Sequence, residues 1–464
     1  MTDTKELLQK ITALRARLNS GGESEASNPL RAMEKKVQHG SIHNALIESA
    51  LRCADPGLTA PPVLPTTRLT ARGARLLRQG RELLQALRKI ADDGDFQDAG
   101  ILTDWHREGM AMLDVLLRTV QAMPASVSMQ LRLCDGLEVV LAAIEERIDR
   151  LCVSLAQRKH SRARIDELAD YLRALASGQV VTLTPLQGLA DLVLDEARAG
   201  RPLRFLHASP ADPSRFAAAH GLTVAQVLAR LIAEDPEWRA QAQLAVMAAL
   251  VHDVGMTRVP AEVLLKETPL DTDERRLIEK HAVIAADMLA PLWPGGGWPI
   301  EAATCHHERK DGTGYPLGRQ EIHLAPFVHL LAVCDVYAAL CAPRPHRRAF
   351  DTRTALTEVL LLAERGFLQQ TSAERLLLLS FYPVGSAVEL SDGAVGVVVR
   401  AHAGDVGLAH PDRPIVLLAA HANGQADSWP IVVDLMEQKH RSIVRALDAD
   451  EKLTALGGKY PQWI

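Results

Sequence analysis

Residues 244–255 read Leu-Ala-Val-Met-Ala-Ala-Leu-Val-His-Asp-Val-Gly, an apolar run that ends in His252 and Asp253. A run with so few polar residues predicts a helix that is buried on all sides. Ionisable side chains at the end of such a helix need hydrogen bonds, counter-charges or a metal ion. The pair therefore marks a candidate site in what we predict to be a mainly α-helical fold.

Further histidines and an aspartate lie in apolar surroundings on both sides of this run. The candidate metal ligands are His220, His252, Asp253, His281, His306, His307 and Asp335. Separate helices of a bundle can each present one or two such ligands to a common centre. Imidazole nitrogens with carboxylate oxygens suit Fe, Mn, Ni, Co or Zn, and the lack of a thiolate pattern argues against a structural zinc. The set exceeds what one ion requires, so we expect two ions bridged by a carboxylate, for which we choose Asp253.

The composition indicates a soluble protein of several domains. The chain has 464 residues, of which 47% are hydrophobic and 23% charged, so two or three domains are expected. The net charge of −5 argues against a nucleic-acid duplex as partner. Residues 1–14 lack the apolar core of a signal peptide, and no stretch is long and apolar enough to span a membrane. The six cysteines include no CxxC pair and indicate reduced thiols, so we expect a cytoplasmic protein.

We expect three regions, with boundaries near residues 182 and 384. Helical patterns in the first region lie at 29–53, 68–92, 100–122 and 126–158. Apolar residues in the last of these, from Leu137 to Leu151, recur at spacings of three and four, which predicts one apolar helical face. We interpret 1–182 as a structural, sensory or dimerising helical region, through which a homodimer or a signalling partner could bind. The second region, 183–384, holds the candidate ligands.

The third region, 385–464, changes to the pattern of β-strands. Asp392-Gly393 lies between the β-branched runs 388–390 and 395–399, and this arrangement predicts a hairpin. Further β-type runs follow at 415–418 and 431–433. We therefore expect a small β appendage at the end of the chain.

Three segments of the middle region resemble the HD-GYP family of the HD metal-dependent phosphohydrolase superfamily. Residues 252–255 resemble its HDxG signature, and residues 306–316, His-His-Glu-Arg-Lys-Asp-Gly-Thr-Gly-Tyr-Pro, match the motif HHExxDGxGYP at every specified letter. Asp335 with Ala339-Leu340 and 344–347, Arg-Pro-His-Arg, resembles the segment DxxxAL…RPYR. Residues 1–182 resemble no family that we recognise.

The resemblance implies a helical HD-type bundle with a bi- or trinuclear metal site, commonly of iron or manganese. It also implies hydrolysis of cyclic di-GMP to linear pGpG and often on to GMP. Carried over by position, the seven residues above are the metal ligands, and His252 and Asp253 are also catalytic. The implied substrate-binding residues are Arg344, Arg347, Tyr315, Gly314 and Asp311. Trinuclear members have a glutamate one turn before the first histidine; Phe216 stands there, so we expect two divalent ions.

The match fails at two charged positions. The lysine of the family's HDxGK is Met256, and the acid that usually follows the last ligand by three positions is Ala338. Arg258 could stand in for the lysine, and His207 competes with His220 as the first ligand. Three hypotheses follow: an active cyclic di-GMP phosphodiesterase, a catalytically weakened cyclic-dinucleotide receptor, and a phosphohydrolase for a nucleotide monoester.

Overall fold

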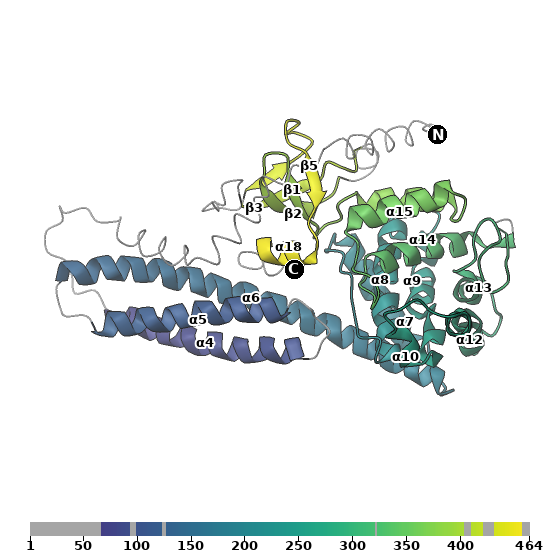
Figure 1. Cartoon of the computed structure of the whole chain (residues 1–464), viewed down its shortest axis with the longest axis horizontal. Helices are drawn as coiled ribbons and strands as arrows, with labels where there is room; N and C mark the ends of the chain where they lie inside the picture. The colour runs from purple at the N-terminus through teal and green to yellow at the C-terminus, as the bar shows by residue number, and fades with distance from the viewer. Residues whose placement is uncertain are drawn as a thin grey trace. The chain divides into compact units, whose positions relative to one another are not determined.

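The structure is a computed structural model that describes residues 66–92, 99–122, 127–320, 323–402, 410–420 and 431–456. All of them belong to one compact unit, 60–464, and the predicted helix at 29–53 lies outside the described residues. The described chain is mainly helical and has a small antiparallel sheet at its C-terminal end (Figure 1), which confirms the predicted fold class. Within these residues, no helix is both long and apolar enough to cross a membrane.

Three long helices, which form the first described part, pack around a shared apolar core. They are α4 (Thr66–Asp92), α5 (Ala99–Ala122) and α6 (Val127–Ala176). Two glycines one heptad apart on α4 let α5 approach closely. A Cβ atom on Gly73 would lie 2.5 Å from the Leu117 side chain, and one on Gly80 would lie 2.0 Å from the sulfur of Met110. The spacing of small residues on α4 therefore fixes how the two helices meet.

Helix α6 continues to Ala176, well beyond the predicted end at residue 158. Its second half keeps an apolar face, on which Ile165, Leu168 and Leu172 are buried. This face packs against α8 (Pro213–Ile232) and the short 3-10 helix η2 (Val254–Arg258). The same helix therefore belongs both to the N-terminal bundle and to the packing around the candidate site.

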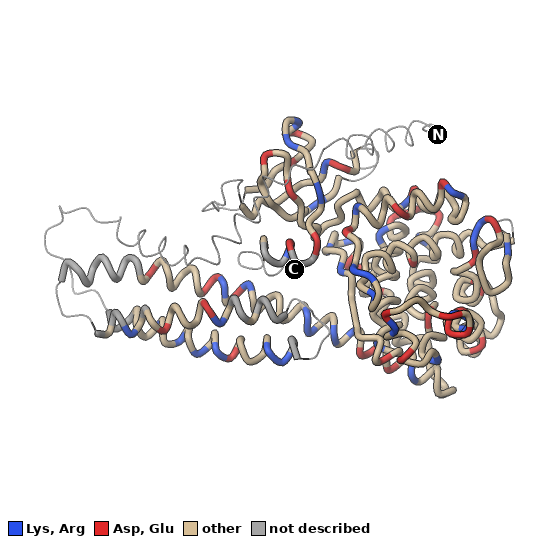
Figure 2. The backbone as a smooth tube through the Cα atoms, in the orientation of Figure 1, with Lys and Arg blue, Asp and Glu red and all other residues tan. Residues whose placement is uncertain are grey.

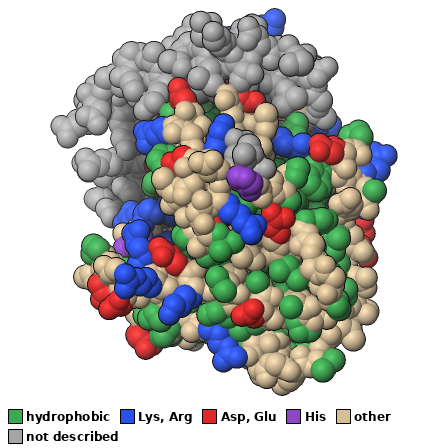
Figure 3. Space-filling view, turned by 90° about the vertical axis from the view of Figure 1, so that its right-hand side faces the viewer, with side chains coloured by type: hydrophobic (Ala, Val, Ile, Leu, Met, Phe, Trp, Pro, Cys, Tyr) green, Lys and Arg blue, Asp and Glu red, His purple; other side chains and the backbone are tan. Residues whose placement is uncertain are grey.

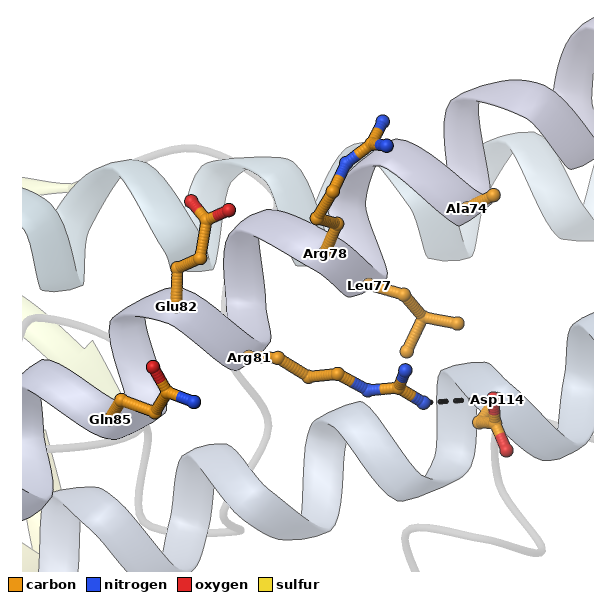
Figure 4. A pocket seen from close by; sticks show the side chains of 7 residues that line it. All are labelled: Ala74, Leu77, Arg78, Arg81, Glu82, Gln85 and Asp114. Atoms are coloured by element: carbon orange, nitrogen blue, oxygen red, sulfur yellow. Dashed lines mark hydrogen bonds and ion pairs between the residues drawn. The ribbon is translucent and has the colours of Figure 1, made fainter.

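The surface of the three-helix part carries charges of both signs along its helices (Figure 2). A hollow between α4 and α5 illustrates this mixture (Figure 4), where Arg81 lies 3.4 Å from Asp114. The face shown in Figure 3 likewise has apolar, acidic and basic side chains interspersed.

The middle part of the chain is built of shorter helices. In chain order these are α7 (Thr184–Arg198), α8, η1 (Arg239–Gln241), α9 (Ala242–Val251), η2, α10 (Ala261–Leu264), α11 (Thr272–Glu279), α12 (His281–Leu289), α13 (Trp298–Cys305), α14 (Pro326–Leu340), α15 (Thr352–Glu364), α16 (Gln370–Glu374) and η4 (Arg375–Leu379). Helices α8, α9 and α14 are buried along most of their length, as their nearly continuous apolar sequences require. Asp212 caps α8 by accepting hydrogen bonds from the backbone of Ser214 and Arg215.

The C-terminal part is a five-stranded antiparallel sheet with the strand order β4-β3-β2-β1-β5. Its strands are β1 (Ala387–Leu390), β2 (Val395–Arg400), β3 (Ile415–Ala420), β4 (Val432–Asp434) and β5 (Ile443–Ala446). The predicted hairpin is confirmed: Ala387 pairs with Val397, and Gly393 adopts φ 76° in the connecting turn. Strand β5 and the following helix α18 (Ala449–Leu456) were not anticipated from the sequence.

Candidate metal centre

All seven candidate ligands meet at one place in the interior, although they come from separate elements. His220 is on α8, His252 and Asp253 follow α9, and His281 begins α12; His306 and His307 follow α13, and Asp335 lies within α14. His252, His281 and His306 are at most 1% exposed. A helical bundle that delivers imidazoles and carboxylates from five elements to one buried point has the form of a metal site.

Asp253 lies at the centre of the group. Its Oδ1 atom is 3.3 Å from Nε2 of His281, 3.4 Å from Nε2 of His306 and 3.6 Å from Nε2 of His252. Its Oδ2 atom is 3.8 Å from Nε2 of His220. One carboxylate thus faces four imidazoles, three of them near Oδ1 and one near Oδ2. This position agrees with the choice of Asp253 as the bridging ligand.

Two overlapping groups of ligand atoms could each hold one ion. One group comprises Asp253, His281, His306 and His307, and the other comprises His220, His252 and Asp253. Asp335 joins from α14: its Oδ1 accepts a hydrogen bond of 2.7 Å from His220, and its Oδ2 is 3.9 Å from Nδ1 of His307.

Three histidines are oriented by the helix that precedes each of them in the chain. Nδ1 of His252 lies 2.8 Å from the carbonyl oxygen of Ala249, and His281 and His306 make the equivalent contact with the carbonyls three residues before them, at 2.6 and 2.9 Å. If Nδ1 carries the proton in this contact, the unprotonated Nε2 points into the centre. Backbone carbonyls therefore set the tautomer that a metal ligand needs.

Two buried atoms in the centre have no hydrogen-bond partner among the described residues, namely Nε2 of His252 and Oδ1 of Asp253. Burial lowers the pKa of His252 to about 4, so this imidazole is neutral at pH 7. Burial alone would raise the pKa of Asp253, but the surrounding imidazoles, His252 foremost, hold it well below its usual range. A neutral imidazole and an ionised carboxylate are the forms that bind divalent cations, so His252 and Asp253 fit such ions.

Two glycines bring the ligand-bearing segments together. A Cβ atom on Gly221 would lie 2.5 Å from the carbonyl oxygen of Leu250, where α8 crosses α9. A Cβ atom on Gly255 would lie 1.9 Å from the carbonyl oxygen of His281. Only glycine permits these approaches, which place His220 beside His252 and Asp253 beside His281.

The loop after His307 is held by Glu308, a buried residue that was not among the predicted site residues. Its carboxylate accepts hydrogen bonds from the backbone of Leu317 at 2.6 Å and of Arg319 at 2.9 Å. Its position in the sequence could have indicated this role. Glu308 directly follows two candidate ligands and precedes a glycine-rich loop, and a buried acid there needs hydrogen-bond donors nearby.

The predicted substrate-binding residues of this loop have different surroundings. The ring of Tyr315 lies 4.7 Å from that of His307, at the edge of the centre. Gly314 is required because a Cβ atom there would lie 2.4 Å from the backbone of His307 and Arg309. Asp311 is exposed and accepts hydrogen bonds from the backbone and the hydroxyl of Thr313, at 3.0 and 2.6 Å, so its observed contacts stabilise the turn.

The two predicted arginines point in different directions. The guanidinium of Arg344 lies over the ring of Phe216, 4.7 Å from its centroid, in a hollow that is also lined by His207, His220 and Ala338. The guanidinium of Arg347 instead donates to the carbonyls of Ala339, Leu340, Ala342 and Arg348, at the end of α14. These donors cap a helix, and the predicted role of Arg347 in substrate binding stays a prediction.

The positions that depart from the family motif are apolar in the structure as well. Met256 is 8% exposed and Ala338 is fully buried, so the missing charge pair leaves no orphaned charge. Arg258 does not replace the lysine, because its guanidinium donates to the carbonyl of Ala176 at the end of α6. His207 lines the hollow beside the centre but is not among the clustered ligands, so His220 is the better candidate for the first ligand.

Comparison with known proteins gives matches that lie in the middle region of the chain. Residues 209–366 match the family model described as HD domain. The chain is 33% identical over 158 residues to a cyclic di-GMP phosphodiesterase of Pseudomonas aeruginosa, covering 34% of this chain and 37% of the relative. It is 32% identical over 186 residues to a 3'3'-cGAMP-specific phosphodiesterase of Vibrio cholerae, and this match covers 39% of this chain and 38% of the relative. It is 37% identical over 123 residues to the cyclic di-GMP phosphodiesterase response regulator RpfG of Xanthomonas campestris, and this match covers 26% of this chain and 32% of the relative. The matches thus span less than two fifths of the length of each relative.

Proposed function

Residues 209–366 match the family model described as HD domain and carry the motif HHExxDGxGYP, and from this premise we propose that the protein is a metal-dependent cyclic di-GMP phosphodiesterase. The products would be linear pGpG, GMP or both. The observation that carries the proposal is the convergence of five histidines and two aspartates on one buried centre. The names of the relatives, which are phosphodiesterases for cyclic dinucleotides, support the choice of substrate.

Two divalent ions, of iron or manganese, would be held by the seven residues. When bound, such ions neutralise charge on the phosphoryl oxygens and lower the pKa of a coordinated water. Asp253 would bridge the two sites, and His252 would hold its Nε2 atom toward them through the contact between its Nδ1 and Ala249.

Other residues of the site would orient the substrate. The guanidinium of Arg344 makes no ion pair with the described residues, so its donors are available for a phosphoryl oxygen. Tyr315 presents a half-buried aromatic ring next to His307, where a nucleotide could pack. Gly314 keeps that ring in place through the close approach of the loop to residues 307–309.

The second candidate function is a cyclic-dinucleotide receptor with little catalytic activity. Met256 and Ala338 favour it, because both positions lack the charges of the family motif. Removing one group that stabilises charge in the transition state can cost on the order of a hundredfold in rate. Binding of the nucleotide would be affected less than turnover.

We also propose the following assignment for the parts of the chain. Residues 1–182 would be a sensory or dimerising region, 183–384 the phosphohydrolase domain and 385–464 an accessory β domain. The separate apolar cores of the three-helix part and of the sheet support this division. A cytoplasmic location is supported by the free thiols of Cys305, Cys334 and Cys341, all buried.

The test is to load the protein with Mn²⁺, or with Fe²⁺ without oxygen, measure its metal content and separate the products formed from cyclic di-GMP and from 3'3'-cGAMP. We expect linear product, lost in Asp253→Asn. Asp287→Asn is the matched control, because Asp287 is exposed on α12. Tight binding without product would support the receptor, and turnover of mononucleotides alone would refute both.

A further inference from the structure

One aromatic side chain beside the centre contacts the arginine that faces it. Phe216 lies on α8 one turn before His220, and its side chain is 8% exposed. The Cζ atom of Arg344 is 4.7 Å from the centroid of the Phe216 ring. A guanidinium at this distance from an aromatic face is attracted to it electrostatically, and more strongly where water is excluded.

The backbone of Arg344 is held in a tight turn after α14. Its N–H donates to the carbonyl of Arg347 at 2.8 Å, and the N–H of Arg347 donates to the carbonyl of Arg344 at 3.0 Å. The side chain of Arg344 therefore starts from a fixed point, but several rotatable bonds separate that point from the guanidinium. Within the described residues the guanidinium has no ion pair and no hydrogen bond of its own, so its contact with the ring can limit its movement.

The position of this guanidinium matters because of the charges nearby. Arg344 lines the same hollow as His220, whose Nε2 atom is 2.7 Å from Oδ1 of Asp335 and 3.8 Å from Oδ2 of Asp253. Burial lowers the pKa of Arg344, whereas the charges of the two carboxylates act to raise it. Met256 brings no positive charge to the same centre. Arg344 can therefore offer a cationic contact to a phosphoryl oxygen that approaches the centre.

We propose that Phe216 is a positioning residue, whose ring holds the Arg344 guanidinium in the hollow beside His220, where it can contact a phosphoryl group of the substrate. The part of this inference that concerns substrate rests on the proposed function. The part that concerns the arginine stands independently, because it follows from the contact between the ring and the guanidinium.

The experiment compares Phe216→Leu, which removes the ring, with Phe216→Tyr, which keeps it. Phe350→Leu is the matched control, since the Phe350 ring lies at the same 4.7 Å from the guanidinium of Arg347. The first measurement is the rate at which phenylglyoxal modifies Arg344 in the metal-free protein, followed by peptide mass spectrometry. We expect Phe216→Leu to raise this rate about 2- to 30-fold, the range that a cation–π contact provides. Phe216→Tyr and Phe350→Leu should leave the rate unchanged.

The second measurement is the Kd of cyclic di-GMP for the Mn²⁺-loaded protein. Phe216→Leu should weaken binding by a similar factor, and should weaken it no further when Arg344→Gln is already present. An unchanged labelling rate in Phe216→Leu, an equal loss of affinity in both backgrounds, or a fall in metal content would each overturn the proposal. If the wild-type protein binds no cyclic di-GMP, the proposed function fails, while the labelling rate still decides whether Phe216 holds Arg344.

Discussion

The replacement of Gly255 by alanine tests whether close packing around η2 builds the metal centre. The new Cβ atom would lie 1.9 Å from the carbonyl oxygen of His281, 2.7 Å from its carbonyl carbon and 2.9 Å from its Cα. These are backbone atoms, so no side chain can turn aside. To reach an ordinary contact of about 3.4 Å, η2 and the start of α12 must separate by about 1.5 Å, the difference between 3.4 and 1.9 Å.

A separation of this size would move His281 relative to Asp253. Their closest ligand atoms are now 3.3 Å apart, and a shift of more than an ångström would spoil a shared coordination sphere. We expect Gly255→Ala to lower the affinity for Mn²⁺ by about 10- to 100-fold, as changes next to metal ligands do. Overpacking should also lower the free energy of unfolding by about 3 kcal/mol or more.

The assay is titration of the metal-free protein with Mn²⁺, together with thermal unfolding. Gly188→Ala is the control: Gly188 lies in the interior of α7, and a Cβ atom there would meet nothing within 4 Å. That variant should bind metal normally and gain up to about 1 kcal/mol from better helix propensity. If Gly255→Ala binds Mn²⁺ as tightly as the wild type, close packing does not build the centre and the reasoning is refuted.

Three further predictions follow from single side chains. Arg347→Met should lower the free energy of unfolding by about 1–2 kcal/mol, because it removes the cap of α14. Arg344→Met should instead weaken the binding of cyclic di-GMP. Equal losses of affinity in the two variants would contradict the different roles of the two arginines. Glu308→Ala frees two backbone N–H groups, so limited proteolysis should cut within 311–320 faster than in the wild type, whereas an unchanged rate would show that the carboxylate does not hold the loop. Burial lowers the pKa of His106, which is fully buried in the three-helix part near the cation of Arg147. As the pH falls below about 6.5, His106 therefore binds a proton in the unfolded chain before it does so in the folded chain. The free energy of unfolding of this part should consequently fall between pH 7.5 and pH 5.5. His106→Gln should reduce that fall, and an identical pH profile in this variant would rule out His106 as its source.

The sequence allowed the residues that converge in the interior to be chosen, because polar residues inside apolar helices are conspicuous. His220, His252 and Asp335 each interrupt a run that must be buried, and the structure brings all three to one point. Their role as metal ligands stays a prediction. Arg344 and Arg347 could not be told apart, because the two lie in one short segment and only the backbone bonds of the turn direct their side chains differently.

The ends of some elements also escaped prediction. The pattern on α6 was followed only to residue 158, although apolar residues continue to Leu175, because the partner of this face changes from α4 to α8 along the helix. Strand β5 is short and half exposed, so its sequence alternates too weakly to reveal it. In both cases the missing information was the identity of the packing partner.

Helix α6 has a mechanical consequence. It is 50 residues long, which corresponds to about 75 Å at 1.5 Å per residue, and from Leu137 to Ala176 it contains neither glycine nor proline. Glycine and proline are the residues at which helices usually kink, so a rotation at one end of this segment would be transmitted to the other end. One end packs on α4 and the other on α8, the helix that carries His220, so torque applied among the N-terminal helices would be delivered to the neighbourhood of a candidate ligand.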